Sequence, residues 1–525
     1  MALEIVASIY TVFVGGFRFQ AGGLRISAAS WSGPLAQAGW LGAIAAWQFH
    51  RDATLRGEWD YVPRTLLAQL SGSADDVRRR LLWFVLIVGS VASLLVSYRI
   101  ARQSLVVGSY EGGWIHPFMA PIALTPFVVW AIASVAVIVA LRWLPDGRHH
   151  SWKTIVIWML LGLGIQGLLR SLTPYTLEQM FASAGANSFY TATLQQDAAT
   201  VLSDFARVRD TWPIHAHSNL PGKLMVVYAL EIVSAQPAVL AWLVVGLSSL
   251  GAWLTYVFVR DLFNDRRVAL FSLILYLFVP GKLFFFPLMN TLTPTVAMAM
   301  AVIVQRWLVT GRVLYATAAG VAVFGVTFFE PIPLVIGVLL AALVARAWRR
   351  GNIAGRALVA HVAVGAFAFI ATYAAVRIWF GFDLIDAFER VSAGAVGFNQ
   401  AAGRRYDVWV RQNLTDFFFG MGVCQTLLFG AALGLGLGET GRGPIWVRPI
   451  VVLGLSLSAM LFAIDVAGIN RGEVIRLWIF LQCLFQIPAA YVCARLNSRV
   501  ALAVVVVTTL LQSALGTATI GFVIP

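Results

Sequence analysis

The composition of the chain excludes an ordinary soluble domain. Of its 525 residues, 59% are hydrophobic and only 12% are charged, whereas soluble domains carry about 25% charged residues. The net charge of +14 does not indicate nucleic-acid binding, because the 38 Lys and Arg residues lie in loops between apolar runs rather than in one patch. Cys424, Cys483 and Cys493 fall inside apolar runs without zinc-like spacing, which predicts small packing residues.

Apolar runs that approach the length of a membrane span recur along the whole chain. A spanning helix needs about 20 predominantly apolar residues. The sequence therefore predicts an all-α polytopic transmembrane helical bundle of about 14 to 16 spans. The expected spans are 3–16, 33–49, 81–98, 126–143, 154–169, 236–259, 268–280, 291–309, 313–329, 331–347, 357–380, 414–437, 449–467, 477–494 and 501–523.

Residues 1–150 differ from the rest of the chain because a predicted hairpin and a long basic loop connect their apolar runs. We expect residues 1–150 to form an N-terminal membrane region and residues 151–525 to form the transmembrane core. Residues 17–30 alternate between apolar and polar types around a Gly-Gly pair, which predicts a short hairpin. Loop 50–80 is basic and is expected to be a solvated connector.

The basic residues assign the loops to two sides of the membrane. Seven loops hold 22 of the 38 Lys and Arg residues, and the positive-inside rule places such loops in the cytoplasm. The alternate connections, among them 170–223, 381–413 and 468–476, are then expected outside. The seven basic loops are 50–80, 142–153, 260–267, 306–312, 346–356, 438–448 and 495–500.

The long outer loop 170–223 carries the first candidate catalytic groups. Residues 190–207 show one apolar stripe at helical spacing, which predicts an interfacial helix lying on the membrane. Glu178 follows a span closely, and Asp197 lies seven residues before Asp204, on the same helical face. Glu178 or Asp197 is a candidate general base for a hydroxyl acceptor. A solvated loop acid is the alternative for each, and a divalent cation is the one cofactor that such acids suggest.

The end of that loop carries candidate anion-binding groups. His215 and His217 precede Pro221 in a stretch expected to be extended, where both side chains point the same way, toward one phosphate or one metal ion. No further ligands at zinc-like spacing are evident, so no metal site is predicted. Lys223 lies at the start of a short apolar helix over 224–233, where a helix N-terminus attracts phosphate.

Two further candidates interrupt the apolar runs. The segment 280–294 contains three prolines, with Lys282 and Asn290 as its expected polar tips, and broken backbone at membrane depth is tolerated where it lines a cavity. Glu330 lies between two apolar runs, immediately before Pro331. A carboxylate at such a break indicates a functional site or a turn in the headgroup region.

The last outer segment combines opposite charges. Glu473 and Arg476 are three residues apart, so they share one face of a starting helix. Arginine suits bidentate contact with phosphate. The alternative is an ion pair that only holds the end of the helix.

These segments resemble known membrane proteins. Residues 215–222 (His-Ala-His-Ser-Asn-Leu-Pro-Gly) resemble the His-Pro-Pro-Gly signature of protein-mannosyltransferase-like enzymes in the GT-C superfamily. Residues 471–478 (Arg-Gly-Glu-Val-Ile-Arg-Leu-Trp) resemble a Gly-Glu-Val-x-Arg-x-Trp motif of actinobacterial GT-C-like membrane proteins, and the hairpin over 15–27 also resembles theirs. The acidic pair usual in the first loop of that superfamily is absent here, which leaves Glu178 or Asp197.

The resemblance implies a function at the outer face of a bacterial plasma membrane. We expect an inverting glycosyltransferase that moves a sugar from a polyprenyl-phosphate donor to a cell-wall or glycolipid acceptor. Glu178 or Asp197 is the expected base, and His215, His217, Lys223 and Arg476, together with Asn290, Glu330 and Glu473, the expected substrate-binding set. The alternatives are a transporter or flippase of lipid-linked glycans and a non-catalytic envelope-assembly protein.

Overall fold

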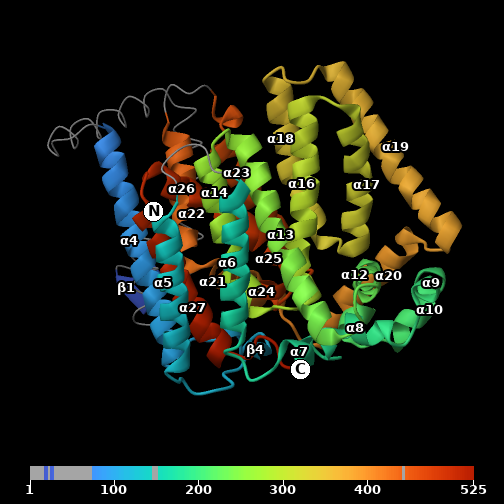
Figure 1. Ribbon diagram of the computed structural model, residues 1–525, viewed down its shortest axis with the longest axis horizontal. Helices are drawn as coiled ribbons and strands as arrows, with labels where there is room; N and C mark the ends of the chain where they lie inside the picture. Colours follow the sequence, from blue (N-terminus) through green and yellow to red (C-terminus); the bar gives the residue numbers. More distant parts are fainter. Residues whose placement is uncertain (1–16, 22–23, 29–73, 145–151, 440–443) are drawn as a thin grey trace.

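The computed structural model describes most of the chain (Figure 1). The described residues are 17–21, 24–28, 74–144, 152–439 and 444–525. The expected spans 3–16 and 33–49 and most of loop 50–80 lie outside them. The expected N-terminal hairpin is confirmed, because strand β1 (Phe17–Ala21) pairs antiparallel with strand β2 (Leu24–Ala28).

The described residues form a bundle of long apolar helices, which confirms the predicted all-α polytopic fold. Within the described ranges, ten helices are long and apolar enough to cross a membrane, or eleven if one bent pair counts as a span. The chain is therefore a multi-pass membrane protein. The ten are α4 (Ala74–Ala101), α5 (Thr125–Arg142), α6 (Trp152–Arg170), α13 (Pro237–Phe263), α14 (Arg266–Leu277) with α15 (Pro280–Phe284), η2 (Met289–Leu292) with α16 (Thr293–Thr310), η3 (Ile332–Ile336) with α18 (Gly337–Arg349), α19 (Gly355–Phe380), α23 (Pro449–Ala467) and α27 (Arg499–Thr519).

Three other expected spans are short or bent. The run 313–329 forms α17 (Val313–Phe329), and the run 477–494 forms α25 (Ile479–Leu484) followed by α26 (Gln486–Arg495). The run 414–437 is divided between α21 (Tyr406–Met421) and α22 (Val423–Gly438), which meet at 98°.

The bend between α21 and α22 is supported by amide side chains. Gly422 adopts φ +103°, a conformation that favours glycine. At the bend, the carbonyls of Phe419 and Met421 accept hydrogen bonds from Gln512 Nε2 at 2.8 Å and Gln486 Nε2 at 3.0 Å. A bilayer supplies no water for these groups, so such a break requires partners within the protein.

The helices differ in how deeply they are buried. In the most apolar part of the span Arg266–Phe284, 94% of the residues are buried, against 6% in Gly355–Phe380. Helix α14 therefore lies at the centre of the bundle, and α19 leaves side chains such as Phe367 and Ile378 exposed on its outside. The three cysteines are free and buried, as expected of packing residues.

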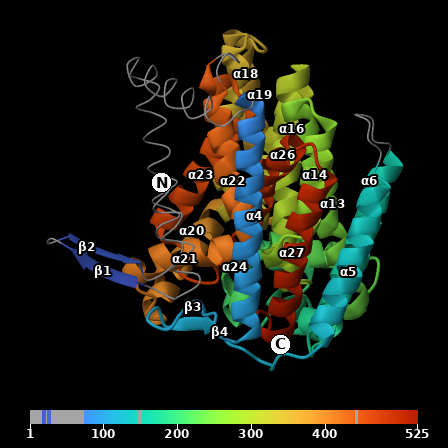
Figure 2. The ribbon, with the colours of Figure 1, turned by 90° about the vertical axis from the view of Figure 1, so that its left-hand side faces the viewer.

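The connections lie at two ends of the bundle. The link between α18 and α19 lies at one end, and strand β4, the short helices of loop 170–223 and α20 lie at the other, which we call the site face (Figures 1 and 2). This grouping agrees with the one expected from the distribution of basic residues. The additional elements are α7 (Leu177–Ala182), α8 (Ser188–Thr193), α9 (Ala198–Ser203), α10 (Phe205–Val208), η1 (Arg209–Thr211), α11 (Ile214–His217), α12 (Gly222–Glu231), α20 (Leu384–Ala401), η4 (Ile445–Val447) and α24 (Val474–Leu477).

Loop 170–223 corrects one sequence prediction. Residues 190–207 do not form one helix but are divided among α8, α9 and α10. Asp197 is extended (φ −86°, ψ 163°) and its side chain accepts a hydrogen bond from the Thr200 N–H, so it begins a new helix. Leu194 is consequently exposed, while Val201 and Phe205 of the expected stripe are buried. Asp204 begins α10, so the two acids do not share a helical face.

A second hairpin packs beside this loop at the site face. Strands β3 (Val107–Ser109) and β4 (Trp114–His116) pair antiparallel in the connection between α4 and α5. The chain after β4 meets the C-terminal segment, where Phe118 pairs with Ile520 and the Gly521 N–H donates to the Pro117 carbonyl at 2.8 Å. These contacts bring residues 114–117 and 520–524 together.

Candidate functional site

A cavity of about 240 Å³ opens among the loops of the site face. Its wall combines ionisable side chains with apolar ones, although the segments that supply them are far apart in the sequence. They are residues 114–117, 185–186 and 521–524 together with His215, Phe285, Leu288, Glu473 and Arg476. Of the nine predicted site residues, the structure brings His215, Glu473 and Arg476 together at this cavity.

Arg476 is the central charged group of the wall. Its Nη2 forms an ion pair with Glu473 Oε2, and its Nη1 lies 3.1 Å from His215 Nε2. Its Nε is buried without a hydrogen-bond partner among the described residues. The guanidinium is therefore held from two sides, while its buried Nε–H lacks an acceptor within the described ranges.

His215 acts as an acceptor toward Arg476. A guanidinium can only donate, so the His215 Nε2 must carry its lone pair, and the imidazole is neutral. Burial, helped by the adjacent Arg476, lowers the pKa of His215 to about 3 against the opposing effect of Glu473. His215 thus orients Arg476 without adding a second positive charge.

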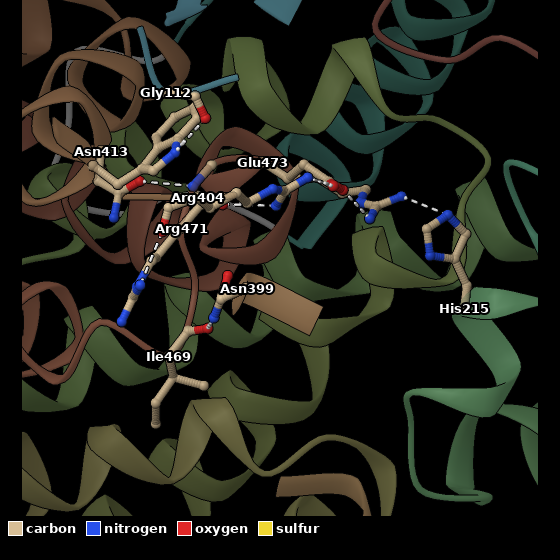
Figure 3. A network of polar contacts seen from close by, with 11 residues as sticks. Gly112, His215, Asn399, Arg404, Asn413, Ile469, Arg471 and Glu473 are labelled. Atoms are coloured by element: carbon tan, nitrogen blue, oxygen red, sulfur yellow. Dashed lines mark hydrogen bonds and ion pairs between the residues drawn. The ribbon is translucent and has the colours of Figure 1, made fainter. Parts of the chain in front are cut away.

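Glu473 is fixed in a strained conformation. It begins α24 with φ +59°, in the left-handed region that non-glycine residues rarely adopt. Its carboxylate contacts Arg404 at 2.9 Å as well as Arg476 (Figure 3). Burial raises the pKa of Glu473, but Arg476 and Arg404 outweigh that effect and lower it to about 2. The carboxylate therefore stays ionised and is a poor proton acceptor at neutral pH.

Arg404 ties this turn to the loop before α21. Its Nη1 donates to the Arg471 carbonyl at 2.6 Å, while Arg471 Nη1 donates back to the Arg404 carbonyl at 2.9 Å (Figure 3). Asn413 Oδ1 accepts from the Gly472 N–H at 3.1 Å. A strained backbone conformation persists where the surrounding contacts hold it in place. These hydrogen bonds hold the backbone of Glu473 in that way.

His116 is a site residue that the sequence did not reveal. Its ring packs against Trp114, with centroids 4.3 Å apart, and against Phe522, at 4.8 Å. Its Nε2 is buried and has no hydrogen-bond partner in the described part of the chain. Burial lowers the pKa of His116 to about 4, although Glu473 and a hydrogen bond with the Gly521 backbone raise it. No sequence pattern marks this histidine before Pro117 as a site residue. The groups that give it a role come from residues 473–476 and 521–522, which are distant in the sequence.

Lys223 and Glu330 form a buried ion pair beside the cavity rather than in its wall. Lys223 Nζ lies 3.1 Å from Glu330 Oε2, and Thr293 Oγ1 donates to the same oxygen at 2.6 Å. Lys223 also donates to Asn219 Oδ1 at 3.2 Å, and Asn219 Nδ2 donates to the His215 carbonyl at 2.8 Å. Burial lowers the pKa of Lys223, while Glu330 raises it. The pair therefore supports the backbone that carries His215.

The prediction that His215 and His217 point the same way is wrong. Both lie on the helical turn α11, which starts directly after Pro213. Residues two apart on a helix point to nearly opposite sides. His217 instead contacts the Arg209 carbonyl at 3.1 Å and Asp210 at 3.6 Å, so it does not line the cavity.

Three other predicted site residues also lie outside the cavity wall. Glu178 on α7 and Asp197 are exposed. Asp197 accepts hydrogen bonds from Thr200 N at 2.9 Å and Thr200 Oγ1 at 2.8 Å, so it serves as a helix cap. Asn290 is buried in η2, and Lys282, expected as a polar tip, is fully buried against Tyr276. Among the described residues, no three His, Cys, Asp or Glu side chains are grouped to hold a metal ion.

The cavity combines anion binding with an apolar surface. Arg404 and Arg476 face one carboxylate, Glu473, which leaves one net positive charge beside a wall formed partly by Phe285 and Phe522. Such an arrangement suits a ligand with an anionic group next to an apolar one. No protein-family model matches the sequence, and no curated protein matches it either.

Proposed function

We propose that the protein transfers a sugar from a polyprenyl-phosphate donor to a cell-envelope acceptor, with the donor phosphate bound at Arg476. The observation that carries this proposal is that Arg476 lines the cavity and that its buried Nε has no partner among the described residues. A buried guanidinium N–H without an acceptor is costly. A phosphate oxygen would satisfy it.

The charge balance supports a phosphate ester as the ligand. The cluster of Arg404, Glu473 and Arg476 carries one net positive charge, because Glu473 offsets only one of the two arginines, although Arg404 itself does not line the cavity. His215 adds no charge, since it is neutral. When the bond from the sugar to a phosphodiester breaks, the leaving polyprenyl phosphate gains negative charge. A fixed guanidinium stabilises that charge more strongly in the transition state than in the ground state, which is the condition for catalysis.

The apolar part of the wall supports a lipid carrier. Phe285, Leu288 and Phe522 line the cavity, and the cavity lies at one end of a bundle whose helices are long enough to cross a bilayer. A polyprenyl chain that stays in the membrane can place its phosphate at this end of the bundle. On the charge distribution of the loops, this end faces outward.

The proposal is tested with purified protein in lipid nanodiscs, a radiolabelled polyprenyl-phosphate hexose and envelope membranes as the source of acceptor. We expect the label to move into the envelope fraction as free polyprenyl phosphate appears. Arg476→Ala should abolish this transfer. The matched variant Arg207→Ala should retain it, because the Arg207 side chain is 77% exposed and pairs with Asp204 on the surface of the same loop. In sealed proteoliposomes, movement of intact donor from one leaflet to the other without polyprenyl phosphate release would support a flippase instead.

A further inference from the structure

The cavity wall contains one histidine, His116, whose acceptor nitrogen has no hydrogen-bond partner among the described residues. His116 is 8% exposed, and its Nε2 has no partner within the described ranges. Trp114, Phe285 and Phe522 enclose the ring. The imidazole is therefore held in one orientation by aromatic contacts, and His116 lines the same cavity as Arg476.

The other candidate acceptors at the site are engaged. The His215 Nε2 accepts from Arg476, and the Glu473 carboxylate is shared between Arg404 and Arg476. The two acids first expected to act as a base do not line the cavity, because Glu178 is exposed on α7 and Asp197 caps α9. Of the described ionisable side chains in the wall, His116 alone has an acceptor atom without any hydrogen-bond partner.

We propose that His116 Nε2 is the general base that takes the proton from the hydroxyl of the sugar acceptor. This inference rests on the proposed glycosyl transfer. The acceptor oxygen forms a bond to the anomeric carbon while its proton passes to Nε2. The bond between that carbon and the phosphate oxygen breaks, and its electron pair leaves with the polyprenyl phosphate beside Arg476. The proton returns to solvent in a later step, which restores the neutral imidazole.

The surroundings of His116 keep its imidazole neutral, as a proton acceptor must be. The charged groups that face it are Glu473, which raises its pKa, and Arg476, which lowers it; His215 lies in the same wall and is neutral. Burial is the largest effect and holds the pKa near 4. At neutral pH the ring is uncharged, and the nearby carboxylate stabilises the imidazolium that forms during transfer.

The test separates proton transfer from donor binding. Donor binding is measured with geranylgeranyl phosphate, and transfer with the labelled polyprenyl-phosphate hexose, for the wild type and His116→Ala. We expect His116→Ala to bind geranylgeranyl phosphate within a few-fold of the wild type and to lose about 100-fold or more in turnover, as is typical when a general base is removed. The matched control is His361→Ala, which should keep full turnover. His361 lies on α19, where its Nδ1 accepts a hydrogen bond from Trp307 Nε1 at 2.9 Å.

Chemical rescue distinguishes a base from a packing residue. Because aromatic rings enclose the His116 side chain, its removal leaves a space of imidazole shape, and added imidazole should restore part of the turnover of His116→Ala. Near-normal turnover of His116→Ala, or a loss that imidazole does not relieve, would overturn the role of His116 and leave the glycosyl transfer standing. Absence of both geranylgeranyl phosphate binding and sugar transfer in the wild type would overturn the proposed function and this inference with it.

Discussion

Arg476 Nη1 lies 3.1 Å from His215 Nε2, although 261 positions separate the two residues in the sequence. This contact joins helix α24 to the long loop 170–223 and forms the charged part of the cavity wall together with Glu473. Because Arg476 also pairs with Glu473, its guanidinium is oriented before any ligand arrives. Preorganised charge of this kind favours a transition state in which negative charge develops.

The first prediction concerns phosphate binding at Arg476. Arg476→Ala should weaken the binding of geranylgeranyl phosphate by roughly 10- to 150-fold, which corresponds to about 1.5–3 kcal/mol for a lost charged hydrogen bond. Arg476→Lys should lose less, since the charge remains, and Glu473→Gln should cause a smaller defect of the same kind. Binding is measured by isothermal titration in nanodiscs, with geranylgeraniol as the probe without phosphate. Unchanged affinity in Arg476→Ala with a lowered melting temperature would mean that the turn is only structural.

The second prediction concerns the buried pair of Lys223 and Glu330. Lys223→Met or Glu330→Gln alone should lower the melting temperature markedly, because removing one partner of a buried ion pair costs about 3–5 kcal/mol. The double variant should be more stable than the sum of the two single losses implies, because it leaves no unpaired charge. Thermal unfolding in nanodiscs measures all four proteins, and strictly additive losses would argue against the pair.

The third prediction concerns Asp197. Its carboxylate is exposed and caps α9 through Thr200, so Asp197→Asn should keep near-normal transfer, and Asp197→Ala should lower the melting temperature slightly. Glu178→Gln should likewise keep turnover. Loss of turnover in Asp197→Asn with unchanged folding and donor binding would restore an acid of loop 170–223 as the base.

The sequence predicted the parts of this site that depend on local spacing. The apolar runs located the helices, and the interval between Glu473 and Arg476 predicted their pairing on one helical face, because both patterns repeat within a few residues. His217 was misjudged because α11 is a single turn, too short for a periodic pattern, although Pro213 directly before it is a helix-start signal. His116 was not identified because tertiary contacts alone give it a role.

The fourth prediction is a dependence of stability on pH. The pKa of His116 is lowered from 6.5 to about 4 and that of His215 to about 3, so the unfolded chain binds more protons than the folded one in acid. The contribution of these two neutral histidines to the free energy of unfolding is constant above about pH 6.5. It is lost progressively as the pH falls toward 4. The pKa of Glu473 is lowered from 4.5 to about 2, which adds a further loss below about pH 4.5.

The melting temperature should therefore fall between pH 7 and pH 4, and less steeply in the double variant His116→Gln, His215→Gln. Differential scanning fluorimetry checks both proteins over that range, with His361→Gln as the matched control. Identical slopes in the wild type and the double variant would mean that neither histidine is held neutral by burial.

The fifth prediction concerns the side of the membrane on which the site lies. A cysteine placed at Gln195 should react with an impermeant maleimide in intact cells, whereas one at Arg350 should react only after permeabilisation; both positions are exposed. The three native cysteines are buried and should give little background. Labelling at Arg350 and protection at Gln195 would place the cavity in the cytoplasm and contradict transfer at the outer face.

The most direct measurement of the central claim is photo-crosslinking of a polyprenyl-phosphate analogue that carries a diazirine next to the phosphate, followed by peptide mapping. We predict that the label attaches to cavity residues such as Leu288 or Phe522, that geranylgeranyl phosphate competes with it, and that Arg476→Ala abolishes it while Arg207→Ala does not. Labelling confined to lipid-facing helices such as α19, or labelling at the cavity that is indifferent to Arg476, would contradict the account.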